Sequence, residues 1–357
     1  MVYLFVLLFC SLYLHAIRNY RVNFLVLFPP FTIYFLVSAL QYNVGTDYFS
    51  YIEIYNTPSL LARYLDAREY SFYYINMVLN YLKAPPQALF FVFSLLQSIF
   101  IFFFLVKAKN KEFTMWILFF IFFTVTNIYN NQLNLIRQYA ALTLIPILSM
   151  YLCDKRYFSF VVGCFIATSF HSSGILFFGF LIFILLYKLV KNYTFFIFVL
   201  TLPLYFYLTK YVSFFLDLLN LNYAYYVEGQ NVDAGSFSSV VTKLYYLPAI
   251  LLFYYVYYRD SFFNPKIKGN GYFPIMIFIF SCTYWSFVMS LEIGMLSRLS
   301  TYFWFFIIFP LYYVAIYFEQ KNKRLFYIYL IYLLLPYATK VTFLAKNEFI
   351  YKSYLFN

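Results

Sequence analysis

The stretch QALFFVFSLLQSIFIFFFLV, residues 87–106, decides the fold class because it runs without a single charged residue. At 1.5 Å per residue, a helix of this length spans about 30 Å, which is the thickness of the hydrocarbon core of a bilayer. A strand of a membrane barrel would instead alternate apolar and polar residues over about ten positions. The stretch therefore predicts a transmembrane helix.

The rest of the chain has the same character, because its 357 residues are 64% hydrophobic and only 11% charged, outside the range of soluble domains. We predict an all-α polytopic membrane protein that forms one integral domain, residues 1–357. A re-entrant or half helix is expected at residues 70–82. Breaks in the apolar runs predict about twelve spans, at residues 2–17, 22–41, 87–106, 113–130, 134–152, 157–170, 173–187, 194–209, 241–258, 272–290, 299–318 and 325–340.

The distribution of positive charge predicts the orientation of the chain. Cytoplasmic loops carry the excess of Lys and Arg, and a hairpin that turns at His171 places most of the 25 cations in inner loops. A single helix over residues 157–187 would erase this bias and would be roughly 46 Å long, which exceeds the hydrocarbon core. The expected extracytoplasmic segments are therefore the loops 42–69 and 210–240 and the tail 341–357.

Arg137 is the sharpest exception to the apolar pattern. On insertion scales an arginine at the centre of a span costs roughly 2.5 to 3.5 kcal/mol, so it needs a partner or water. Helical spacing predicts that Asn134, Gln138 and Ala141 share its face. The structural interpretation is an arginine bonded to backbone carbonyls or reaching the interface. The functional interpretation is an anion clamp, with Asn134 and Gln138 as substrate contacts, because the planar guanidinium matches phosphate oxygens.

A second arginine, Arg298, occurs at the expected outer start of another span. Two outward-facing arginines on separate helices can bind one diphosphate between them. Tyr302 and Glu292 are close in sequence, and we expect both to contact the substrate. The structural alternative is a salt bridge between Arg298 and Glu292.

Two further residues on the expected outer face can accept a proton. His171 lies at the predicted outer turn, and a neutral imidazole can deprotonate a hydroxyl; the alternative is a packed, hydrogen-bonding histidine. Asp47 is either a carboxylate base or the N-cap of a short helix. Tyr48 and Tyr51 follow Asp47, and we expect them to form a platform for sugars.

Other chemistries lack their motifs. The sequence contains no Walker loop, no GxGxxG and no basic nucleic-acid arm, so neither a nucleotide cofactor nor a nucleic-acid partner is expected. The two histidines are distant and form no HExxH motif, so we expect no metal site. Four cysteines without paired spacing are expected to pack or to face lipid: Cys10, Cys153, Cys164 and Cys282.

Four stretches, in this order, resemble the EpsG/Wzy family of bacterial polysaccharide polymerases: VGTDYFSYIEIY (residues 44–55), NLIRQYAALTLI (134–145), FIATSFHSSGILF (165–177) and LSRLSTYFWFFIIFPLYY (296–313). The resemblance implies a GT-C-like glycosyltransferase of the bacterial cytoplasmic (inner) membrane, with its active site on the periplasmic or extracytoplasmic face. It implies undecaprenyl-diphosphate-linked oligosaccharides as donor and acceptor, with no cofactor and no metal. A flippase and a chain-length regulator are the protein partners it suggests.

Under this interpretation, Arg137 and Arg298 bind the diphosphate, and Asp47 or His171 deprotonates the attacking hydroxyl. A single displacement predicts inversion at the anomeric carbon. Two other functions remain open: an O-antigen ligase, which uses the same donor, and a flippase for lipid-linked oligosaccharides, which is not an enzyme. The remaining acidic candidates for the base are Glu69 and Glu292.

Overall fold

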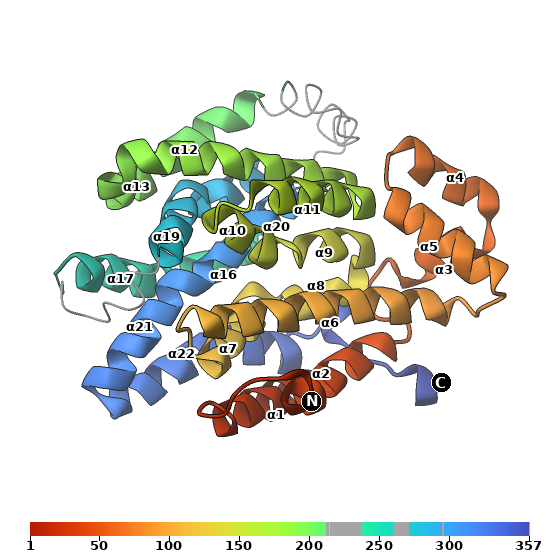
Figure 1. Cartoon of the computed structure of the whole chain (residues 1–357), viewed down its shortest axis with the longest axis horizontal. Helices are drawn as coiled ribbons and strands as arrows, with labels where there is room; N and C mark the ends of the chain where they lie inside the picture. The colour runs from red at the N-terminus through yellow and green to blue at the C-terminus, as the bar shows by residue number, and fades with distance from the viewer. Residues whose placement is uncertain (212–213, 215–236, 260–270, 295, 357) are drawn as a thin grey trace. The chain divides into compact units, whose positions relative to one another are not determined.

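The computed structural model describes residues 1–211, 214, 237–259, 271–294 and 296–356, and it is helical with no strand among them (Figure 1). Seven helical segments in this part of the chain are long and apolar enough to cross a membrane, as expected for a polytopic membrane protein: Gln87–Asn110, Ile136–Cys153, Ser172–Tyr211, Val240–Arg259, Tyr272–Leu291, Leu296–Lys321 and Lys323–Thr342. Four shorter apolar helices accompany them: Val2–Ala16, Phe24–Ala39, Met115–Thr126 and Tyr157–Phe170.

The chain divides into two compact units. The first unit is Met1–Phe177 with Tyr332–Asn357, and the second is Phe178–Ile331. The long helix α22 (Lys323–Thr342) belongs to both, because the division falls within it.

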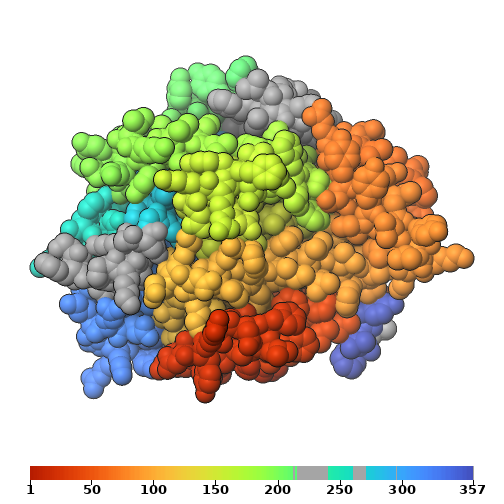
Figure 2. Space-filling model, viewed as in Figure 1, coloured from red at the N-terminus to blue at the C-terminus, as the bar shows by residue number. Residues whose placement is uncertain are grey.

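The first unit contains the N-terminal helices: α1 (Val2–Ala16), α2 (Phe24–Ala39), α3 (Tyr48–Asn56), α4 (Pro58–Asp66), α5 (Tyr70–Tyr81), α6 (Gln87–Asn110), α7 (Met115–Thr126), α8 (Ile128–Asn134), α9 (Ile136–Leu142), α10 (Ile145–Cys153), α11 (Tyr157–Phe170) and the 3-10 helix η1 (Ser172–Gly179). Every residue of α7 is buried, so this helix forms the centre of the unit. Helix α2 packs along α6, and α1 packs against α2 and α7. The surfaces of α1 and α2 lie beside that of α6 in Figure 2.

The second unit contains these helices within the described residues: α12 (Phe180–Val190), η2 (Lys191–Tyr193), α13 (Thr194–Leu208), η3 (Thr209–Tyr211), α16 (Phe237–Leu244), α17 (Leu247–Arg259), α19 (Tyr272–Thr283), η4 (Tyr284–Leu291), α20 (Leu296–Trp304), η5 (Phe305–Ile307) and α21 (Ile308–Lys321). Its core is aromatic. Phe198 on α13 lies between Tyr254, Phe280 and Trp285, with ring centroids 5.2, 6.0 and 5.5 Å away.

Each predicted span overlaps one to three consecutive helices, and α5 covers the residues predicted as a half helix. The predicted outer loop 42–69 contains two short helices, α3 and α4. The predicted loop 210–240 lies largely outside the described residues. The chain breaks at His171 as expected: its backbone is extended, and Gly174 packs so tightly on the last turn of α11 that a Cβ there would lie 2.6 Å from the carbonyl carbon of Ala167.

The C-terminal segment is fastened to the loop that precedes α3. The Tyr42 amide donates to the Lys352 carbonyl (3.0 Å), and the Tyr354 amide donates to the Leu40 carbonyl (2.7 Å). The Tyr3 hydroxyl donates to the Glu348 carbonyl (2.8 Å), and the short helix η6 (Asn347–Phe349) packs on α8. This C-terminal segment therefore supports the loop that leads to Asp47.

Candidate active site

The first unit contains an ion pair that lies mostly out of solvent. Arg137 Nη1 on α9 donates to Glu69 Oε2, and the side chains are 18% and 4% exposed. Taking two charges out of water is costly unless each finds a partner. The sequence anticipated that Arg137 needs a partner, and the structure identifies that partner as Glu69.

The chain fixes Glu69 through the turn between α4 and α5. Arg68 adopts a left-handed backbone (φ 62°), and the Glu69 amide then donates to the Tyr64 carbonyl (2.8 Å). This turn places Glu69 immediately before α5, where its carboxylate does not cap the helix. The carboxylate is therefore available to Arg137 and to the turn after α11.

Three aromatic rings surround the Arg137 guanidinium. Its Cζ lies 4.4 Å from the ring centroid of Tyr64, 5.1 Å from that of Phe72 and 5.9 Å from that of Tyr51. A cation over a ring face gains about 0.5 to 2 kcal/mol, more where water is excluded. Arg137 Nε is buried and has no hydrogen-bond partner among the described residues.

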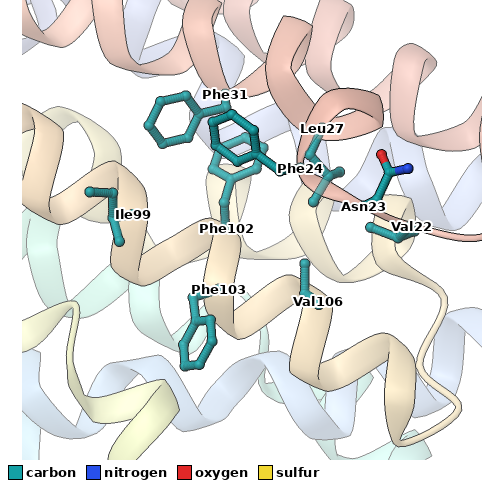
Figure 3. Close-up of a pocket in the computed structure, with 9 residues that line it drawn as sticks. All are labelled: Val22, Asn23, Phe24, Leu27, Phe31, Ile99, Phe102, Phe103 and Val106. Carbon is teal, nitrogen blue, oxygen red and sulfur yellow. The ribbon is translucent and has the colours of Figure 1, made fainter.

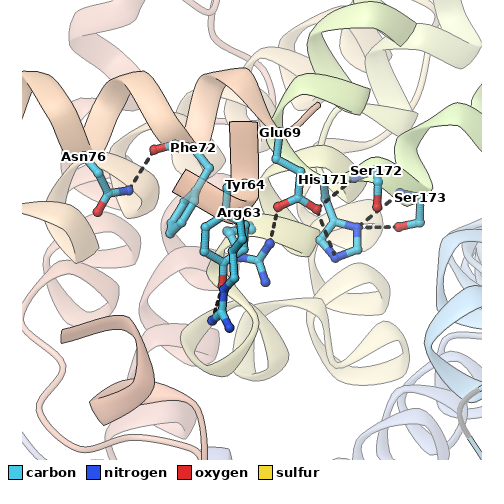
Figure 4. A network of polar contacts seen from close by, with 9 residues as sticks. Arg63, Tyr64, Glu69, Phe72, Asn76, His171, Ser172 and Ser173 are labelled. Atoms are coloured by element: carbon cyan, nitrogen blue, oxygen red, sulfur yellow. Dashed lines mark hydrogen bonds and ion pairs between the residues drawn. The ribbon is translucent and has the colours of Figure 1, made fainter. Parts of the chain in front are cut away.

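The second oxygen of Glu69 faces His171 (Figure 4). Glu69 Oε1 accepts the Ser172 amide at 3.1 Å and lies 4.0 Å from His171 Nε2. The other imidazole nitrogen, Nδ1, is 2.6 Å from the Ser173 hydroxyl. Glu69, Arg137 and His171, which come from three separate segments of the chain, thus form one cluster, which we call the Glu69 cluster.

Asp47 is held by a second set of contacts in the same unit. Its amide donates to Asn134 Oδ1 at 2.9 Å, and its carboxylate accepts the Thr46 hydroxyl at 3.0 Å. Gly45 makes this approach possible, because its φ is +81° and a Cβ there would lie 2.4 Å from Asn134 Oδ1. Asp47 occupies the N-cap position of α3, but its side chain makes no capping bond.

Among the other first-unit candidates, the tyrosines are buried. Tyr48 stacks on Phe90 with centroids 4.5 Å apart, and its hydroxyl donates to Gln87 (2.9 Å). Burial raises the pKa of Tyr51 to about 12, so its hydroxyl stays protonated beside Arg137. Gln138 is also buried. Their roles as substrate contacts stay predictions.

The prediction that Asn134, Arg137 and Gln138 share one continuous helical face is wrong. Helix α8 ends at Asn134, and Leu135 leaves the helical region (φ −101°, ψ 62°) before α9 begins. The Asn134 side chain is bonded to the Asp47 loop, and the carbonyl that follows the break, that of Ile136, accepts the Gln97 amide (2.9 Å). These tertiary bonds override the helical periodicity.

Arg298 lies in the second unit, and its pairing with Arg137 stays a prediction. Arg298 is exposed on α20, and Glu292, which directly follows η4, is exposed too, whereas Tyr302 is buried. Lys243, which sequence analysis missed, donates to Ser300 (3.3 Å) on the same helix as Arg298.

Glu69 was predicted only as an alternative base, and Tyr64 and Phe72 were not predicted. The position of Glu69, directly before the predicted half helix, was the available signal. No signal singles out the two rings in a chain with 43 Tyr and 51 Phe. All four cysteines are free, and the part of the chain that the structure describes contains no group of three His, Cys, Asp or Glu side chains arranged around a metal.

The sequence model of the EpsG family matches residues 24–355, which include every residue of the Glu69 cluster and the loop at Asp47. No curated protein and no solved structure matches the chain.

Proposed function

The chain belongs to the EpsG family of polysaccharide polymerases, and we propose that it moves a growing glycan from undecaprenyl diphosphate onto a hydroxyl of a new lipid-linked repeat unit. The observation that supports this most directly is the Glu69 cluster. It combines a cation for the diphosphate with groups able to take up the proton of the attacking hydroxyl.

We propose that the chain crosses the bacterial cytoplasmic membrane about twelve times, that α5 is a half helix, and that the architecture is GT-C-like. Non-helical backbone at membrane depth is tolerated only where protein shields it or where it lines a cavity. The breaks at Leu135 and His171 support such a site, because both occur beside the Glu69 cluster. We place the cluster on the periplasmic or extracytoplasmic face.

In this mechanism Arg137 binds the diphosphate of the donor, and Arg298 is its proposed second ligand. Before the donor binds, Glu69 balances the charge of Arg137. The rings of Tyr51, Tyr64 and Phe72 keep the guanidinium in place. Negative charge grows on the diphosphate as the anomeric C–O bond breaks, and fixed cations stabilise that charge. Removing one such electrostatic contact typically costs about 2.7 to 4 kcal/mol in the transition state.

We assign the base to His171, with Asp47 as the alternative. The acceptor hydroxyl attacks the anomeric carbon from the face opposite the diphosphate, and its proton passes to the neutral imidazole of His171. Glu69 Oε1, 4.0 Å from His171 Nε2, stabilises the imidazolium that results. One displacement of this kind inverts the anomeric configuration.

The decisive experiment incubates the purified protein with undecaprenyl-diphosphate-linked repeat units, without nucleotide or metal, and measures glycan length. Elongated, lipid-linked products are expected, and Arg137→Gln should reduce their rate of formation by a hundredfold or more. Transfer only to a different lipid acceptor would indicate a ligase. Unchanged substrate that crosses the bilayer of proteoliposomes would indicate a flippase. The flippase and chain-length regulator suggested as partners are absent from this assay, so activity would show that they are dispensable for bond formation.

A further inference from the structure

An apolar groove lies between α2 and α6. It lies beside the start of α2, just after Arg21, and beside the second half of α6, just before Lys107. It has a volume of about 250 Å³. Figure 3 shows the side chains that line it, including Phe24, Leu27, Phe31, Ile99, Phe102 and Val106. Its volume is below the roughly 300 to 1,000 Å³ of pockets that enclose a drug-sized ligand, so it fits a segment of an alkyl chain.

Cations gather at one end of this groove. Arg21 immediately precedes the lining residue Val22, and Lys107 immediately follows the lining residue Val106. Lys109 Nζ donates to the backbone carbonyls of Tyr20 (2.6 Å) and Arg18 (3.3 Å), which fastens the loop before α2 to the end of α6. Arg18 and Arg21 are exposed.

Acidic residues offset this charge only in part. Asp154 is already paired with Lys111 at 2.6 Å, and Glu112 is exposed beyond the end of α6. The groove thus combines an apolar trough with neighbouring cations on the loop before α2 and in the last turn of α6, which we call the cationic rim: Arg18, Arg21, Lys107 and Lys109.

We propose that this groove binds an anionic phospholipid of the cytoplasmic leaflet, with one acyl chain in the trough and the phosphate at the cationic rim. Basic pockets between membrane helices on the cytoplasmic side suit acidic headgroups. The excess of positive charge assigns this end to the cytoplasmic side. The occupant is therefore distinct from the diphosphate donor, which the mechanism uses on the opposite face.

The test is a lipid titration of the full-length protein in detergent micelles, read by native mass spectrometry. Phosphatidylglycerol is compared with phosphatidylcholine of the same acyl chains, so that only the headgroup charge differs. Each cation near an anionic headgroup is worth about fivefold in affinity. Arg18→Gln with Arg21→Gln should therefore weaken phosphatidylglycerol binding about 25-fold and leave phosphatidylcholine unchanged.

Two further variants make the result specific. Lys321→Gln with Lys323→Gln removes two exposed cations of the second unit, and we expect unchanged affinity. Val106→Trp fills the trough and should weaken both lipids. Equal affinity for the two lipids, or an unaffected Arg18/Arg21 variant, would overturn the proposal, as would phosphatidylglycerol binding that survives Val106→Trp.

Discussion

The ion pair between Glu69 and Arg137 gives the sharpest prediction about stability. Removing one partner of a buried pair costs about 3 to 5 kcal/mol, because the other charge is left uncompensated out of water. Arg137 keeps 18% of its side chain exposed, which allows some rehydration, so we expect Glu69→Gln to cost about 3 kcal/mol, at the lower end of that range. Arg137→Gln should cost more, because it also loses its contacts with the three rings.

The double variant Glu69→Gln with Arg137→Gln should be more stable than the sum of the single losses predicts. No uncompensated charge remains, so a coupling of about 2 to 3 kcal/mol is expected. The measurement is the free energy of unfolding in mixed micelles for the wild type, both single variants and the double variant. This cycle isolates the pair from the separate effect of each side chain.

The chain provides a matched control in the ion pair between Lys111 and Asp154. Its N···O distance is 2.6 Å, but its side chains are 19% and 36% exposed. Exposed pairs contribute about 0 to 1 kcal/mol, so Asp154→Asn should change the free energy of unfolding far less than Glu69→Gln does. Equal losses in these two variants, or strictly additive losses in the double variant, would refute the description of Glu69 and Arg137 as a buried, mutually compensating pair.

Three further perturbations test the site around this pair. Gly45→Ala should lower the free energy of unfolding, measured by denaturation in mixed micelles, by at least about 1 to 2 kcal/mol from its left-handed φ alone. The control Gly179→Ala, whose Cβ meets nothing within 4 Å, should be neutral or stabilising. Equal effects of the two substitutions would contradict the close approach at Gly45. His171→Ala should slow polymerisation of lipid-linked repeats by about 10² to 10⁴ if it is the base, and a rate close to that of wild type would shift that role to Asp47. Tyr64→Leu should lower the free energy of unfolding by about 0.5 to 2 kcal/mol from the lost cation–π contact while Tyr64→Phe retains most of it, and a larger loss in the phenylalanine variant would show that the hydroxyl matters more than the ring.

Hydropathy predicted the positions of the helices well, because each apolar run must satisfy its backbone hydrogen bonds internally if it is to enter lipid. The 3.6-residue period failed at Leu135. On either side of this residue, the Asn134 side chain accepts the Asp47 amide, and the Ile136 carbonyl accepts the Gln97 side-chain amide. Such bonds depend on segments far away in sequence. A periodic pattern within one segment carries no information about them.

The candidate site was predicted in part. An arginine inside a span can be recognised from the sequence because burying its charge is costly. A lone histidine at a break between apolar runs can be recognised just as easily. Glu69 was less visible, because it lies in a mixed-charge loop where several acidic residues satisfy the same local criteria. Only the packing of α5 against α11 shows which carboxylate meets Arg137 and His171.

The fastening of Tyr42 to Lys352 and of Tyr354 to Leu40 also has a consequence for biosynthesis. A ribosome makes residues 352–354 only after it has made every helix of the second unit. Until then, the segment that leads to Asp47 lacks these two backbone bonds and is held only by earlier partners such as Gln87 and Asn134. Nascent chains that already contain Arg137 and His171 therefore carry an unfinished loop, and this part of the protein matures after its helices have been synthesised.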